Sequence, residues 1–91
     1  MKVTGTIYKV MESFTYSDKF AKQEFILEME DNGFKELIKF QLVNNNRSQL
    51  DNFGEGAKVD VTFSLKGREV EKDGAFGYYT NLDAWKIDSV D

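Results

Sequence analysis

Apolar and polar residues alternate along most of the chain with a period of two, which is typical of half-buried β-strands. Residues 20–30 show this clearly, with Phe25 and Leu27 on one side and Lys22 and Glu24 on the other. The same pattern, or an enrichment in β-branched and aromatic residues, predicts further strands at 3–14, 34–42, 58–66 and 78–87. The sequence therefore predicts five strands.

The apolar side of each strand is expected to form the core. This assigns the following residues to it: Phe25, Leu27, Phe34, Ile38, Phe40, Leu42, Val59, Val61, Phe63, Leu65, Leu82 and Ala84. Gly5 lies inside the first strand, where a residue without a side chain lets the strand coil sharply or bulge. Alternation breaks at Trp85 and Ile87, which predicts a bulge or a change of sheet.

Turn signals separate the strands. Asn32 and Gly33 tolerate the positive φ values of a two-residue hairpin turn. Residues 69–77 form a predicted polar loop, with Lys72-Asp73-Gly74 as its turn.

Residues 44–54 predict one short helix. Asn46 can cap its start, Gln49 can reach back from the third position, and Gly54 can end it. Leu50 and Phe53 fall on one face and are expected to plug the end of a small β core.

The order strand, strand, strand, helix, strand, strand predicts an all-β fold, a five-stranded OB-fold barrel with one short helix between strands 3 and 4. An SH3-like barrel is the alternative, and the helix in mid-chain argues against it. With 91 residues, no proline and no linker, residues 1–91 are expected to form a single domain.

Composition limits the chemistry. The chain has no Cys and no His, which removes disulfides, Cys/His zinc sites and catalytic triads with an imidazole base. No carboxylate pair, phosphate loop or metal cluster stands out, so we expect no enzyme, no metal and no cofactor. No long apolar run or signal sequence is visible, which predicts a cytoplasmic protein without a membrane partner.

The net charge of −4 is the wrong sign for a general polyanion binder. Residues 1–50 carry seven basic and seven acidic side chains, whereas residues 51–91 carry five and nine. Any nucleic-acid site must therefore be a local basic face.

Aromatic and basic residues are interleaved in the segments that border the binding groove of an OB-fold. Unpaired bases stack on aromatic rings while Lys and Arg neutralise phosphates. The candidate nucleic-acid-binding residues are Tyr16, Phe20, Lys22, Lys35, Lys39, Lys66, Arg68, Lys72, Phe76, Tyr78, Tyr79 and Trp85.

Several candidates have a structural alternative. Glu24 and Glu28 could pair with lysines across the sheet. Packing on the barrel is favoured over base stacking for Trp85. Tyr78 and Tyr79 are consecutive in a strand and must point to opposite faces, so at least one is expected to be exposed.

Three runs resemble a known family: KQEFILE at 22–28, KGRE at 66–69 and YTNLDAWKI at 79–87. In this order and spacing they are similar to small bacterial and phage OB-fold proteins related to single-stranded DNA-binding protein. The resemblance implies single-stranded DNA binding in replication, recombination or repair, without catalysis or cofactor. It suggests four of the candidates for the groove: Lys22, Arg68, Tyr79 and Trp85.

One feature departs from that family. Housekeeping members usually carry a long flexible tail with an acidic, hydrophobic tip that recruits partners, whereas this sequence ends at Asp88-Ser89-Val90-Asp91. We therefore expect a phage or accessory protein without tail-mediated recruitment.

The leading hypothesis is a single-stranded DNA-binding protein that is largely independent of sequence. The alternative is a protein-interaction subunit in which exposed aromatics such as Phe76, Tyr78 and Tyr79 dock on a partner or on another copy, giving a dimer or tetramer. RNA or oligosaccharide binding is a third hypothesis, because the fold alone does not fix the ligand.

Overall fold

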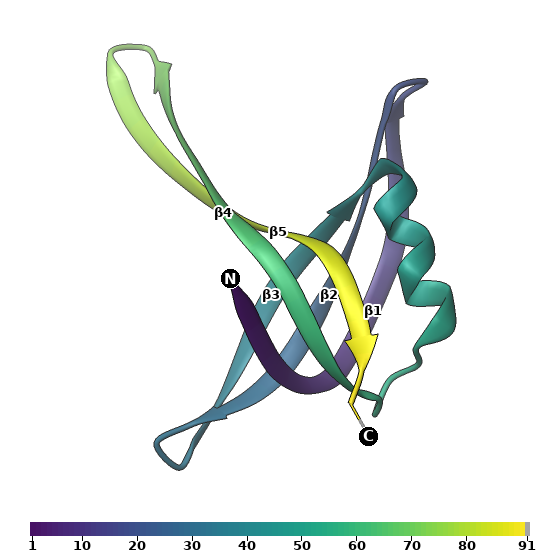
Figure 1. Cartoon of the computed structure of the whole chain (residues 1–91). Coiled ribbons are helices and arrows are strands. Elements are labelled where there is room, and N and C mark those ends of the chain that lie inside the picture. Colours follow the sequence, from purple (N-terminus) through teal and green to yellow (C-terminus); the bar gives the residue numbers. More distant parts are fainter. Residues whose placement is uncertain (91) are drawn as a thin grey trace.

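The computed structural model describes residues 1–90, which form five strands and one 3₁₀ helix (Figure 1). In chain order the elements are β1 (Lys2–Ser17), β2 (Phe20–Asp31), β3 (Phe34–Val43), η1 (Asn44–Asn52), β4 (Lys58–Lys72) and β5 (Ala75–Ser89). The strands close into a barrel in the order β1-β2-β3-β5-β4. Neighbouring strands are antiparallel except β3 and β5, which run parallel. The predicted fold class, a five-stranded OB-fold barrel with a helix between strands 3 and 4, is confirmed.

The core consists of apolar side chains from alternate positions of the strands. The largest fully buried ones are Ile7, Phe25, Leu27, Phe40, Leu42, Val59 and Val61. Phe25 and Phe40 stack with their ring centroids 5.5 Å apart, and Phe63 meets Phe40 edge-on at 5.1 Å. Burial of a side chain of this size contributes about 1.5–3 kcal/mol. The alternation therefore identified the centre of the core.

Two residues on the apolar side of the pattern are not in the core. Phe34 is 71% exposed and Leu65 is 53% exposed, so their assignment to the core is wrong. Both lie on hairpins that continue beyond the barrel (Figure 1). Alternation identifies one face of a strand, but burial also requires a second layer of chain to cover that face.

The predicted polar loop at 69–77 is instead part of a long hairpin. The strands β4 and β5 stay paired from Val59↔Ser89 to Lys72↔Ala75. The turn lies where predicted, with φ of 53° at Asp73 and 82° at Gly74, the positive values that a type I′ turn requires. We call residues 65–82 the β4–β5 ribbon, and residues 29–38, which turn in the same way at Asn32 and Gly33, the β2–β3 ribbon.

The helix plugs the barrel as expected, since Leu50 is buried and Phe53 packs against the core. Its start differs from the prediction. It begins at Asn44, with Val43 in the capping position and no side-chain cap, so the capping roles predicted for Asn46 and Gln49 are wrong. The amide of Gln49 is used elsewhere: its Nε2 donates to the Trp85 carbonyl at 3.0 Å.

The break in alternation near the end of the chain is a bulge, as predicted. Thr62 pairs with Lys86 and Phe63 pairs with Ala84, which leaves Trp85 as the extra residue. The bulge sends the Trp85 side chain outward, where it is half exposed, and restores Ile87 to the core.

Gly5 lies where β1 passes from one neighbour to the other. The next residue, Thr6, pairs with Lys58 on β4 and with Glu28 on β2. A Cβ on Gly5 would lie 2.5 Å from the carbonyl oxygen of Glu28 and 2.8 Å from Cγ of Leu27. The absence of a side chain therefore lets β1 cross β2 closely enough to close the barrel.

Candidate nucleic-acid interface

The outer face of the barrel is made by the residues that alternate with the core positions. On β1 and β2 the register places Phe14 opposite Lys22, near the turn between the two strands. Tyr16 and Phe20 lie beside them, with ring centroids 5.6 Å apart, and Lys22 Nζ lies 5.6 Å from the centroid of Tyr16. We call Phe14, Tyr16, Phe20 and Lys22 the ring cluster.

The rings of this cluster are available to a ligand. They are between 41% and 59% exposed, because the hairpin that carries them continues beyond the barrel. A cation over an exposed ring contributes about 0.5–1 kcal/mol, which orients Lys22 along the surface. Tyr16, Phe20 and Lys22 were predicted from the sequence. For Phe14 the sequence left a core role and a binding role open, and its cross-strand register with Lys22 places it beside the cluster.

Lys35 and Lys39 lie on the outer face of β3, but both are ion-paired. Lys35 Nζ lies 3.4 Å from a carboxylate oxygen of Glu28, and Lys39 Nζ lies 3.5 Å from one of Glu24. This is the structural alternative that the sequence left open. These pairs make the middle of the outer face close to neutral. Because exposed pairs of this kind contribute only about 0–1 kcal/mol, either lysine can exchange its carboxylate for another anion.

A second set of candidates gathers on one face of the β4–β5 ribbon. Alternation along β4 brings Lys66, Arg68 and Lys72 to the same side, and the register places Tyr79 opposite Arg68. Within residues 1–90 none of these three basic side chains forms an ion pair. We call Lys66, Arg68, Lys72 and Tyr79 the basic strip.

Gly77 sets the position of the tyrosine in the basic strip. A Cβ on Gly77 would lie 3.4 Å from the Tyr79 ring and 3.6 Å from its hydroxyl oxygen. The ring therefore lies along the strand over Gly77, next to the opposing Arg68, and is 55% exposed. A ring held flat on a ribbon presents one face for stacking.

Phe76 and Tyr78 lie on the opposite face of the ribbon. Their cross-strand partners are Glu71 and Glu69, respectively. The structure thus separates these two aromatics from the basic strip and places each opposite a glutamate.

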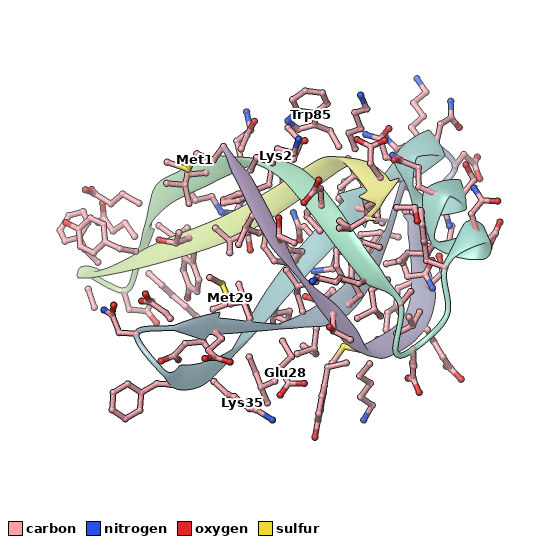
Figure 2. All side chains as sticks on the ribbon, turned by 60° about the horizontal axis from the view of Figure 1, so that its bottom comes forward. Met1, Lys2, Glu28, Met29, Lys35 and Trp85 are labelled. Atoms are coloured by element: carbon pink, nitrogen blue, oxygen red, sulfur yellow. The ribbon has the colours of Figure 1, made fainter. Side chains whose placement is uncertain are left out.

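Trp85 is also apart from the other candidates. Figure 2 shows it with Lys2 along one side of the barrel, opposite the side that carries Glu28 and Lys35. The bulge that exposes its ring lies in the pairing of β5 with β4.

Arg47 on η1 is a polar feature that the sequence did not single out. Its Nε donates to the Asn44 carbonyl at 2.8 Å and its Nη1 donates to Ser13 Oγ at 2.6 Å. It lines two adjoining polar hollows between the helix and the β1–β2 hairpin, one of which reaches Phe20 of the ring cluster. Because Arg47 makes no ion pair within the described residues, it is a further cation beside the ring cluster.

The barrel order connects these features. The ring cluster lies on β1–β2 and the basic strip on β5–β4, so β3 lies between them. There Gln41 pairs with Asp83 and its Nε2 donates to the Asp83 carboxylate. From β2 through β3 to β5, the outer face thus carries exposed rings on the β1–β2 hairpin and, on the β4–β5 ribbon, basic side chains without an ion pair among the described residues.

The acidic side chains do not gather into a metal site, since no group of three or more Asp and Glu among residues 1–90 is arranged to hold an ion. In the same part of the chain, no helix is long and apolar enough to span a bilayer.

A closed five-stranded barrel with this strand order and a helix between β3 and β4 defines the OB-fold. The family described as "Domain of unknown function (DUF3127)" matches residues 2–88, and the chain belongs to this family. No curated protein has a significantly similar sequence.

Solved structures with the same fold include three small proteins. The mitochondrial single-stranded DNA-binding protein Rim1 from S. cerevisiae has a TM-score of 0.76 and 19% identity, over 99% of this chain and 92% of its own. The dimeric N-terminal domain of PriB from Thermoanaerobacter tencongensis has a TM-score of 0.69 and 16% identity, over 100% and 94%. A small single-stranded DNA-binding protein from Streptomyces coelicolor has a TM-score of 0.62 and 13% identity, over 99% and 92%. At such identities the likeness concerns the fold.

Proposed function

We propose that this protein binds single-stranded DNA, largely independently of sequence, and that it serves replication, recombination or repair. The observation that carries the proposal is that the outer face bears the exposed ring cluster on the β1–β2 hairpin and the basic strip on the β4–β5 ribbon, with β3 between β2 and β5. Support also comes from solved structures of the same fold whose names describe single-stranded DNA binding.

The ring cluster supplies the stacking part of the interaction. Each stacked base contributes about 1–3 kcal/mol and every base has a π-face, so such contacts tolerate any sequence. Tyr16 and Phe20 are the first candidates for stacking, and Lys22 lies near enough to neutralise the adjoining phosphate.

The basic strip supplies phosphate contacts without sequence information. Lys66, Arg68 and Lys72 have no carboxylate partner among the described residues, so a phosphate meets no internal competitor. At the middle of the path, Lys35 and Lys39 would exchange a carboxylate for a phosphate oxygen at small cost. The net charge of −4 is compatible with this path because a local basic region attracts the strand while the acidic remainder repels it elsewhere.

A titration of fluorescently labelled oligothymidine tests the proposal. An OB-fold occupies about 4–16 nucleotides, so an oligomer of about 10–20 nucleotides should raise the anisotropy at low salt. Duplex DNA and RNA of the same length are the comparison ligands, and single-stranded DNA is expected to bind most tightly. A flat anisotropy at high protein concentration would reject DNA binding.

Salt dependence provides a second readout. The logarithm of the binding constant should fall linearly with the logarithm of the salt concentration, by about 0.7 per phosphate neutralised on a single strand. A binding constant that does not respond to salt would contradict phosphate neutralisation by the lysine and arginine side chains.

A further inference from the structure

The inner faces of the two ribbons, which continue the core side of their strands, carry apolar and acidic residues. Within the described chain neither inner face carries Lys or Arg. On the β4–β5 ribbon the inner face consists of Leu65, Gly67, Glu69, Glu71, Phe76, Tyr78, Thr80 and Leu82. On the β2–β3 ribbon it consists of Met29, Asp31, Phe34, Glu36 and Ile38. Both ribbons therefore place carboxylates beside exposed apolar side chains.

A cleft lies at the point where the two ribbons separate. Over the described residues β3 and β5 pair at one position, Gln41↔Asp83, and from there the two ribbons diverge on the same side of the barrel in both views (Figures 1 and 2). Ile38, Phe40 and Leu82 line the cleft where the strands separate. Lys39 also reaches it but is paired with Glu24 at 3.5 Å. We call the cleft and the two inner faces the acidic cleft.

The negative charge of the acidic cleft argues against two ligands, a nucleic acid and a second copy of this chain. Asp31, Glu36, Glu69 and Glu71 would repel the phosphates of a nucleic acid. A second copy packed on this ribbon about a two-fold axis beside Glu69 and Glu71 would bring these side chains against their own copies, and like charges in direct opposition destabilise a sheet contact.

The backbone also has capacity to bind. Residues 75–82 of β5 pair with β4 along one edge, and within the described chain the other edge has no strand partner. Such an edge can accept an extended peptide through main-chain hydrogen bonds, with alternate side chains directed at the neighbouring face.

We propose that the acidic cleft binds an extended segment of a partner protein in which every second side chain faces the ribbon, and these ribbon-facing side chains are in turn Lys or Arg and apolar. The apolar residues would contact Leu65, Phe76 and Tyr78, and the cations would lie near Glu69 and Glu71. Because the basic strip is on the other face of the same ribbon, the protein can hold this partner and DNA simultaneously. The inference thus goes beyond the proposed function.

The probe, called the Lys/Val peptide, is a labelled ten-residue peptide with Ser at every second position and Lys and Val in turn at the positions between. Its comparison, the Lys/Gly peptide, has Gly in place of Val. We expect the Lys/Val peptide to bind with a Kd below about 1 mM and the Lys/Gly peptide to bind more weakly. The double variant Glu69→Gln/Glu71→Gln should weaken Lys/Val binding about fivefold to tenfold, because two exposed ion pairs with the peptide can no longer form. Phe76→Ala should weaken it as well.

The matched control is Glu12→Gln/Asp18→Asn, which removes the same charge from the β1–β2 hairpin and should leave peptide binding unchanged. Equal losses in the two double variants would mean that the peptide follows net charge alone, and would overturn the proposal. The absence of peptide binding to the wild-type protein would also overturn it. Circular dichroism checks that each variant is folded.

Two further measurements separate this inference from others. Glu69→Gln/Glu71→Gln should leave oligothymidine binding intact, and Lys66→Ala/Arg68→Ala should leave peptide binding intact. Sedimentation velocity tests the second copy: self-association that disappears in Glu69→Lys/Glu71→Lys would assign the cleft to another protomer and refute a separate partner.

Discussion

The side chain of Gln49 serves as a strand partner for the bulge at Trp85. Its Nε2 donates to the Trp85 carbonyl at 3.0 Å, and its Oε1 accepts from the amide of Ile87 at 2.8 Å. One amide group thus pairs the two backbone positions on either side of Lys86 and joins the helix to β5. The bulge depends on this contact because its backbone groups lose their regular partners.

Gln49→Ala should therefore destabilise the fold. Ile87 is buried, and an amide left without a partner costs about 1–3 kcal/mol. We expect the free energy of unfolding to fall by this amount in urea denaturation. Asn52→Ala, at an exposed position on the same helix, is the control and should change it little. Equal stability of the two variants would contradict the role of Gln49.

Removal of basic side chains from the basic strip should weaken DNA binding equally for all DNA sequences. For Lys66→Ala/Arg68→Ala we expect the slope of log K against log salt to decrease by about 0.7 for each phosphate that is no longer neutralised. Lys86→Ala is the control, because Lys86 is paired with Asp88 at 3.7 Å and lies next to Trp85 in β5. Anisotropy titrations with oligothymidine and a mixed sequence provide the measurement. A loss of affinity that depends on the DNA sequence would argue against phosphate binding by Lys66 and Arg68.

Tyr16→Ala should reduce affinity because one base can no longer stack. The expected loss is about 1–3 kcal/mol, or about fivefold to 150-fold in Kd, without a comparable change in the salt slope. Tyr16→Phe keeps the ring and should bind nearly as well as the wild type. If both variants bind alike and weakly, the hydroxyl rather than the ring is the important group.

The fluorescence of Trp85 should show how far bound single-stranded DNA extends around the barrel. It is the single tryptophan of the chain, and stacking on a base would quench its fluorescence. Because it lies on the side of the barrel opposite Glu28 and Lys35 (Figure 2), we expect no quenching with about 8 nucleotides and quenching with about 30, beyond the usual range for one OB-fold. Quenching by the short oligomer would place Trp85 in the primary path.

Gly5→Ala should be one of the most destabilising small substitutions. The added methyl group would lie 2.5 Å from a backbone oxygen of β2, and overpacking of this kind typically costs about 1–3 kcal/mol. Gly54→Ala is the matched control, because a Cβ there meets nothing within 4 Å. Urea denaturation of both variants compares them, and similar midpoints would contradict the crossing geometry.

Local sequence patterns predicted the strands, the turns and the bulge at Trp85 because each depends on neighbouring residues. The exposure of Phe34 and Leu65 depends on where the barrel ends, which alternation does not contain. The hydrogen bonds of Gln49 could not be predicted either, because Trp85 and Ile87 are more than thirty residues away along the chain.

The candidate site shows the same limit. Exposed rings and bases could be selected by type, as for Tyr16 and Arg68. Their grouping could not, because it depends on cross-strand register: Tyr79 faces the basic strip, whereas Tyr78 faces Glu69. Pairing of Glu24 and Glu28 with lysines was an open alternative, and the structure forms these pairs with Lys39 and Lys35; register brings Phe14 opposite Lys22.

The junction of β3 and β5 is a parallel contact at one position, Gln41↔Asp83, whereas β4 and β5 are paired over most of their lengths. Amide protons along this seam should exchange with deuterated solvent sooner than those in the middle of β2, where both edges are hydrogen-bonded. Local opening of the barrel at the β3–β5 seam would let the β4–β5 ribbon move relative to the β2–β3 ribbon while the core around Phe25 stays closed.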